Sequence, residues 1–244
     1  MKRLLLTLRF VGTNYAGWQV QRNAPAVQKT LQDAAERVFG ARPGITGCSR
    51  TDSGVHALMF CCHLDTDSDI PPERLPAALN ANLPRDIAVT GAREVPPDFH
   101  ARYSCKSKTY QYRMYRSEYR DPFYDPMMLR LPRDVSPAHM SAAAARFVRT
   151  ADFTSFCAAG SSVADPVRTV FRCGVTRDEP FVTLEAEGDG FLYNMVRIMA
   201  GTLIETGMKQ LPPEHIDEII AARDRGRAGK TAPAHALYLA EVKY

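Results

Sequence analysis

The sequence lacks the patterns of a metalloprotein, a dithiol redox protein or a membrane protein. Its six cysteines form no C-x-x-C pair, and no histidine lies at metal-ligand spacing from them, so we expect neither a metal nor a cofactor. The only early apolar run, Leu4–Leu6, is interrupted at Thr7 and Arg9 and no small-residue cleavage site follows, which argues against a secretory signal. We therefore expect reduced, buried thiols in a cytoplasmic protein that has no membrane segment.

The chain also has little net charge. It has 31 Lys and Arg against 27 Asp and Glu, a formal charge of +4, and 45% of its residues are apolar. These values exclude fibrous and disordered classes and are typical of a globular protein. Its 244 residues are enough for one large domain or two smaller ones.

The hydrophobic pattern predicts two α+β halves. Alternation from Leu4 to Phe10 indicates a strand, and apolar residues at every fourth position over 27–38 indicate a helix that ends at Gly40. The first hundred residues read β-α-β-α-β, and the rest repeats strand, helix, strands, helix, strand. We predict halves at 1–100 and 101–244, each with a split β-α-β pattern and joined between Pro96 and Lys106. The expected later elements are an extended stretch at 102–116, strands at 167–175, 181–186 and 237–242, and helices after Ser136, Gly190 and Pro213.

A polar loop directly ahead of the predicted strand 58–64 holds the strongest catalytic candidate. Asp52 stands there with Arg50 two residues before it and Gly54 two residues after it. A turn that merely begins the strand is the simpler interpretation. Asp-Ser-Gly also matches the signature of aspartic proteases, which need two carboxylates sharing one proton. The chain has no second Asp-Ser-Gly or Asp-Thr-Gly, so only a dimer would complete such a site.

The helix after Gly190 carries a cation that needs a partner. Its apolar residues occupy nearly the whole circumference, which predicts a buried helix, and a buried arginine requires a counter-charge. We therefore expect Arg197 to pair with a carboxylate, unless its side chain extends along the surface into solvent. If Asp52 is that carboxylate, the ion pair lowers the Asp52 pKa, and a permanently ionised aspartate suits a nucleophile.

The segment 102–133 combines positive charge with aromatic rings. It has eight Lys and Arg against three acidic residues, a net +5, and seven aromatic residues. Cations that bind phosphates and rings that stack on bases are typical of proteins that bind unpaired nucleotides. Tyr110, in Lys-Thr-Tyr, is our candidate for stacking. Alternatively, Tyr110 and Tyr112 form the core face of a strand.

Together these motifs resemble the family of tRNA pseudouridine synthases A, the TruA family, over essentially the whole chain. The matching segments, in family order, are Tyr15-Ala16-Gly17-Trp18-Gln19, Arg50 to Ala57, Phe99-His100-Ala101-Arg102, Lys108-Thr109-Tyr110, Gly190 to Arg197, and Thr231-Ala232-Pro233-Ala234. Two positions depart from the usual pattern: Ser49 replaces a more common glycine, and Met59 a more common glutamine.

The resemblance implies a homodimer that converts uridines at positions 38–40 of the tRNA anticodon stem-loop to pseudouridine without metal or cofactor. It also implies the pseudouridine synthase fold, a mostly antiparallel mixed sheet flanked by helices with a central cleft. Asp52 would be the nucleophile, Arg197 its basic partner and Tyr110 the ring that stacks on the target base. Arg50 would take part in base flipping or contact phosphates, and we expect Lys108 and Arg102 to bind substrate. A non-catalytic RNA-binding protein remains the alternative, ahead of the dimeric protease.

Overall fold

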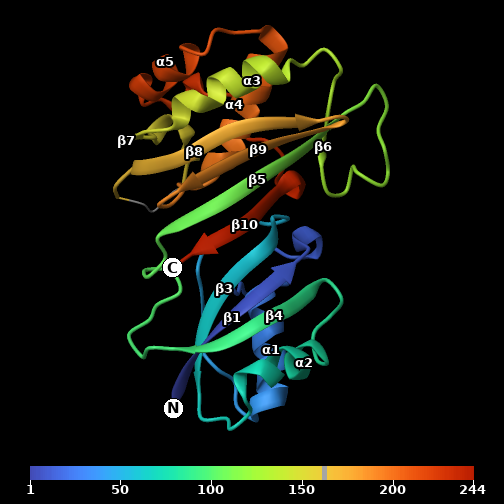
Figure 1. The fold of residues 1–244 in the computed structure, drawn as a ribbon, viewed down its shortest axis with the longest axis vertical. Helices are drawn as coiled ribbons and strands as arrows, with labels where there is room; N and C mark the ends of the chain where they lie inside the picture. Colours follow the sequence, from blue (N-terminus) through green and yellow to red (C-terminus); the bar gives the residue numbers. More distant parts are fainter. Residues whose placement is uncertain (161–163) are drawn as a thin grey trace. The chain divides into compact units, whose positions relative to one another are not determined.

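The computed structural model describes residues 1–160 and 164–244 and divides them into two compact units (Figure 1). Unit 1 consists of Met1–Lys106 and Leu239–Tyr244, and unit 2 of Ser107–Tyr238. The sequence pattern placed the division at residue 100 and assigned the whole C-terminal part to the second half. In the structure the last residues belong with the first unit.

The sheet of unit 1 is antiparallel and has an apolar inner face. Its strand order is β4 (Ile87–Val95), β1 (Lys2–Phe10), β3 (His56–Thr66) and β10 (Leu237–Lys243), and the short β2 (Ile45–Gly47) pairs with β3. In β1, Leu4, Leu6 and Leu8 are fully buried, which confirms the strand that their alternation predicted. Leu6 lies opposite Cys62 on one side and Ala92 on the other.

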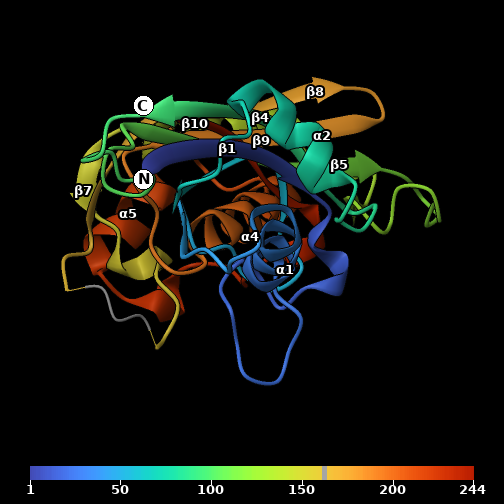
Figure 2. The same cartoon turned by 90° about the horizontal axis from the view of Figure 1, so that it is seen from below.

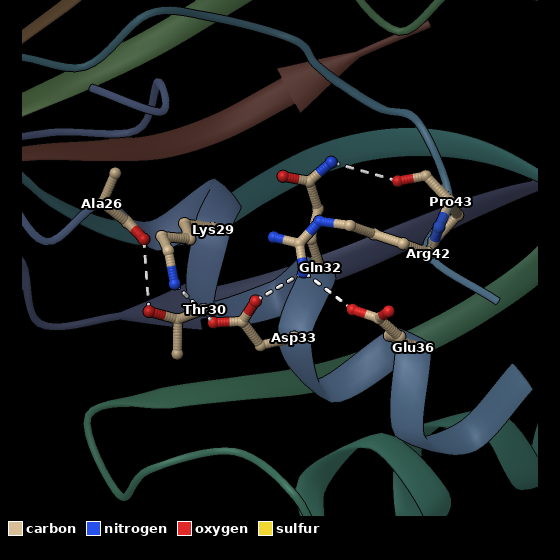
Figure 3. Close-up of polar contacts among 8 residues, drawn as sticks. All are labelled: Ala26, Lys29, Thr30, Gln32, Asp33, Glu36, Arg42 and Pro43. Carbon is tan, nitrogen blue, oxygen red and sulfur yellow. Dashed lines mark hydrogen bonds and ion pairs between the residues drawn. The ribbon is translucent and has the colours of Figure 1, made fainter. Parts of the chain in front are cut away.

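Helix α1 (Val27–Phe39) supports this sheet with one face and forms an ion-pair network with the other. Its buried residues are Val27, Leu31, Ala34 and Ala35, and Gly40 ends it with a φ of 74°, as the sequence predicted. On the exposed face, Asp33 accepts from Lys29 at 2.9 Å and from Arg42 at 2.6 Å (Figure 3). The Gln32 amide donates to the Pro43 carbonyl at 3.0 Å. These contacts fold the chain beyond the helix back toward β2.

The remaining helix of unit 1 follows β3. A 3-10 turn, Pro72–Arg74, leads into α2 (Leu75–Asn80), which has Pro76 in its first turn. Asn80 links the end of α2 to the next strand, because its side chain accepts a hydrogen bond from Val89 N at 2.7 Å and donates one to Val89 O at 2.9 Å.

The sheet of unit 2 is mixed and mostly antiparallel. Its order is β5 (Ser107–Arg116), β9 (Phe181–Gly188), β8 (Val167–Asp178) and β7 (Thr150–Asp152), with β6 (Leu129–Leu131) parallel to β5. Alternate β5 residues form its buried face: Tyr110 lies opposite Ala186, and Tyr112 opposite Leu184. Residues 102–106 precede this strand as a turn, in which Ser104 N donates to His100 O at 2.9 Å, so the extended stretch is shorter than predicted.

The described residues of unit 2 form three α-helices: α3 (Pro137–Ala144), α4 (Met195–Lys209) and α5 (His215–Ala222). Figure 2 shows α4 and α5 on the same side of β8 and β9. Ser136 caps α3 as predicted, since its hydroxyl accepts from His139 N at 3.4 Å. Helix α4 begins later than Gly190, because Asn194 adopts a φ of 59° immediately before it. No helix of the described chain is long and apolar enough to span a membrane.

The α+β prediction is confirmed, with five α-helices in the described residues. The sequence did not reveal β2, β6 and β7, which have three residues each. Such short segments carry no readable alternation, and only pairing with a longer strand makes them strands.

Candidate active site

The Asp52 loop in unit 1 connects β2 to β3. Asp52 is half-buried and Arg50 is exposed. Val55 N donates to Asp52 O at 3.2 Å, and Gly54 has a φ of 79°, a conformation that glycine adopts without strain. The loop is therefore a tight turn with a carboxylate at its bend, as the simpler interpretation also predicted.

A second loop, residues 12–18, packs against the Asp52 loop through the main chain. Trp18 N donates to Thr51 O at 3.3 Å, and Gly54 N donates to Tyr15 O at 3.2 Å. A Cβ added at Gly17 would lie 2.3 Å from Thr51 O, and one added at Gly12 would lie 2.0 Å from Val55 O. Both sides of Asp52 are thus fixed by backbone that approaches too closely for any side chain.

Two large buried side chains anchor residues 12–18. Trp18 is 3% exposed and stacks on Phe60 of β3 with ring centroids 4.1 Å apart. The Tyr15 hydroxyl donates to Asp86 at 2.8 Å, and burial followed by this hydrogen bond raises the Tyr15 pKa. His56, at the start of β3, accepts from Gly12 N at 2.9 Å. The sequence motif around Tyr15 and Trp18 therefore supports the Asp52 loop.

Arg102 lies far from Asp52 although both belong to unit 1. It follows Ala101, whose backbone N donates to His63 Nδ1 at 3.1 Å. His63 is seven residues along β3 from His56, a span of roughly 23 Å at 3.3 Å per residue. Arg102 is exposed and belongs to a different surface from the Asp52 loop.

In unit 2, Tyr110 lies on β5 with 7% of its surface exposed. Its ring is nearly perpendicular to that of Phe191, and the two ring centroids are 5.4 Å apart. Lys108, two residues earlier, is half-buried. Tyr112 is fully buried and donates to the Pro233 carbonyl at 2.9 Å. Both tyrosines lie on the buried face of β5, as the core interpretation predicted for them. Tyr110 differs from Tyr112 in that its ring lies beside Phe191, a residue of the segment that leads to α4.

Arg197, in the first turn of α4, is half-buried and hydrogen-bonded. Its Nε donates to Ala232 O at 2.8 Å and its Nη1 donates to Asn194 Oδ1 at 2.7 Å. The guanidinium is thus fixed inside unit 2 and does not extend along the surface into solvent. Asp52 belongs to unit 1, so the predicted ion pair between these two residues stays a prediction.

The segment 229–233 positions two of these side chains through its carbonyl groups. Ala232 O accepts from Arg197, and Pro233 O accepts from Tyr112. The segment lies directly on α4, since a Cβ added at Gly201 would be 1.8 Å from Lys230 O. Residues 231–234 match a family motif, but their sequence indicates no role for them, because they act through backbone carbonyl groups, which every residue has.

The basic segment 102–133 uses part of its charge within unit 2. Arg113 lies over the Tyr238 ring at 4.4 Å, Arg116 pairs with Glu179 at 2.6 Å, and Arg130 donates to Glu118 O at 2.8 Å. The segment therefore has fewer cations available to bind a ligand than its net charge indicates. In the described residues no group of three or more His, Cys, Asp or Glu side chains could hold a metal ion.

Comparison with known proteins shows similarity along the whole chain. Residues 7–104 and 143–244 match the family model described as tRNA pseudouridine synthase. The chain is 46% identical over 246 residues to tRNA pseudouridine synthase A of Moorella thermoacetica and 44% identical over 245 residues to that of Ruminiclostridium cellulolyticum. It is 43% identical over 244 residues to that of Acetivibrio thermocellus. Each alignment covers 100% of both chains.

Proposed function

Because the chain belongs to the family of tRNA pseudouridine synthases A, and so is an isomerase, we propose that it acts on uridines at positions 38–40 of the tRNA anticodon stem-loop. A dimeric protease would involve only the Asp-Ser-Gly segment, and a non-catalytic RNA-binding protein would give Asp52 and Arg197 no task. Similarity to the synthases extends over the full length and includes both residues. The Asp52 loop carries this proposal. Its carboxylate is half-buried, and its backbone is fixed on both sides by glycines that admit no Cβ.

The reaction requires one bond to break and another to form. The N1–C1′ bond of uridine breaks, C1′ bonds to C5, the C5 hydrogen leaves as a proton, and N1 takes up a proton. Asp52 supplies the nucleophile, and its rigid loop keeps the carboxylate oriented toward the extruded nucleotide. The proposed reaction uses no metal or cofactor.

The other residues bind and orient the substrate. Tyr110 provides a ring for the target base, supported from the side by Phe191. Arg197 serves as the basic partner of Asp52, and its two hydrogen bonds inside unit 2 fix its orientation. Arg50, exposed in the Asp52 loop, contacts phosphates or replaces the flipped base, and Lys108 and Arg102 add cationic contacts to the RNA.

The test is Asp52→Asn with tRNA that carries tritium at C5 of uridine. We expect this variant to fold and to bind tRNA while releasing no tritium, because the amide removes the nucleophile and little volume. Asp69→Asn, an exposed substitution in the same unit, is the control and should release tritium at the parent rate. Near-normal release by Asp52→Asn would overturn the assignment.

We also propose that the protein is a cytoplasmic homodimer. The local charge of segment 102–133 supports this proposal, since two copies would present two basic segments to one folded RNA. Light scattering after gel filtration should give twice the mass of 27.1 kDa. A monomeric mass that persists in the presence of tRNA would refute the dimer.

A further inference from the structure

The turn after β4 presents a stack of flat side chains to solvent. The rings of His100 and Tyr103 lie 4.3 Å apart between centroids and are inclined by 26°. Tyr103 is 77% exposed, and the Arg102 guanidinium lies 5.9 Å from its centroid, near the outer limit of a cation–π contact. We name His100, Arg102 and Tyr103 the ring platform. His100 stacks on the Tyr103 ring, and most of the Tyr103 surface stays exposed to solvent.

Buried and half-buried groups hold the main chain of this turn in place. Ala101 is fully buried; its N donates to His63 at 3.1 Å, and its O accepts from the Tyr244 hydroxyl at 2.9 Å. Arg3 donates to Phe99 O at 2.9 Å. Burial lowers the pKa of His63, which favours the neutral ring that can accept a hydrogen bond.

Local contacts also orient the rings of the platform. His100 Nδ1 accepts from the backbone N of Arg102 and of Tyr103, at 3.2 Å each. The exposed Tyr103 ring is therefore held in place before any partner arrives. A preorganised ring loses little conformational entropy when a ligand stacks on it.

The charge around the platform selects the chemistry of the partner. Residues 98–106 include Arg102 and Lys106, both exposed, against one acidic residue, the exposed Asp98. An apolar protein surface would leave these cations unpaired, and an acidic peptide would leave the ring without a stacking partner. A nucleic acid satisfies both, because unpaired bases stack on exposed rings and phosphates pair with Lys and Arg.

The platform is too far from Asp52 to contact the reacting nucleotide. It adjoins His63, whereas the Asp52 loop precedes His56, and the seven residues of β3 from His56 to His63 span roughly 23 Å. A contact at this distance reaches a different part of the same RNA.

We propose that the ring platform is a second tRNA contact, which stacks an unpaired base on Tyr103 and holds its phosphates with Arg102 and Lys106. This inference rests on the proposed function, because it assumes that tRNA is the substrate. It assigns His100 and Tyr103 to substrate binding and leaves the chemistry at Asp52.

Tryptophan fluorescence tests the stack directly. The chain has one tryptophan, Trp18, which is 3% exposed, so Tyr103→Trp adds a distinct exposed emitter. In an Asp52→Asn background, which prevents turnover, we expect saturating unmodified tRNA to quench the added emission by at least about half. Met208→Trp, at a 53% exposed position near the end of α4, is the control for absorption by the RNA and should lose far less.

The outcomes separate the two proposals. If tRNA is retained in filter binding but Tyr103→Trp is quenched no more than Met208→Trp, the ring platform is wrong and the proposed function stands. If no tRNA is retained, both are wrong.

A kinetic split provides the second measurement. Tyr103→Leu should raise KM for tRNA about tenfold, since base–ring stacking is lost, with kcat within about twofold. Tyr103→Phe keeps the ring and should restore the parent KM. A fall in kcat without a change in KM, or equal losses for Leu and Phe, would overturn the stacking contact.

Discussion

Unit 1 and unit 2 hold their candidate site residues by different means. In unit 1 the Asp52 loop is fixed by backbone against backbone, with Gly12 and Gly17 so close to it that a methyl group would overlap carbonyl oxygens. In unit 2 the site side chains are fixed by hydrogen bonds to carbonyls, from Arg197 to Ala232 and from Tyr112 to Pro233. A close backbone fit tolerates no added atom, whereas a hydrogen-bonded side chain loses its orientation only in part when one bond is removed.

Among substitutions that alter how the two units hold their site residues, Gly17→Ala should have the largest effect. Its φ of +95° and the Cβ position 2.3 Å from Thr51 O force the Asp52 loop to move. We expect kcat to fall at least about 100-fold, as displacement of catalytic groups by an ångström does, and stability to fall by about 2 kcal/mol. Tritium release and urea unfolding measure the two effects.

Gly40→Ala is the matched control. Gly40 also has a positive φ, +74°, but no atom lies within 4 Å of its added Cβ. It should lose about 1 kcal/mol of stability and keep full activity. If Gly17→Ala kept the parent kcat, the backbone fit would not be what positions Asp52.

Arg197→Lys should have the next largest effect. Lysine keeps the charge, but its single ammonium cannot reproduce the planar fork that reaches Ala232 O and Asn194 Oδ1 together. We expect kcat to fall about tenfold in single-turnover assays. Arg177→Lys, at an exposed arginine of the same unit, should leave kcat unchanged, and equal behaviour of the two variants would contradict the role of the fork.

Tyr112→Phe should affect stability more than activity. It removes the hydroxyl that donates to Pro233 O at 2.9 Å and should reduce the free energy of unfolding by about 1 kcal/mol. The segment 229–233 retains its bond to Arg197, so kcat should fall only a few-fold. Tyr119→Phe, at a 73% exposed position, should change neither quantity. A loss of activity as large as that of Gly17→Ala would remove the distinction between the units.

The smallest effect should be the contribution of Asp65 to the pH dependence of folding stability. Arg3 hydrogen-bonds both carboxylate oxygens, at 2.7 and 2.8 Å, and this hydrogen bond is the largest cause that lowers the Asp65 pKa below its ordinary 3.8. A depressed pKa stabilises the fold above pH 3.8, and the contribution disappears as pH falls through the folded value.

Because Asp65 is 37% exposed, solvent screening limits this contribution to a few tenths of a kcal/mol. Asp65→Asn should therefore be less stable than the parent at pH 7 in urea unfolding, and the difference should shrink toward pH 3. A difference that grows on acidification would contradict this sign.

The sequence predicted the long elements better than the supports of the site. Helix α1 and strand β1 followed from their periodicity because each buries one regular face. Asp52, Tyr110 and Arg197 were selected because their types and neighbours are chemically unusual. Residues 15–19 and 231–234 were matched as motifs but received no role, since much of what they do in the structure is done by backbone groups, which every residue has.

The α+β class and the family can be read from the sequence alone, and so can the choice of Asp52, Tyr110 and Arg197 as candidates for the chemistry, because side-chain type and periodicity are local properties. Only the tertiary structure decided that residues 239–244 join the first unit, that α4 begins at Met195 and that carbonyls of 232 and 233 orient Arg197 and Tyr112. These features depend on contacts between segments far apart in the chain. No local pattern encodes which backbone oxygen a distant side chain will meet.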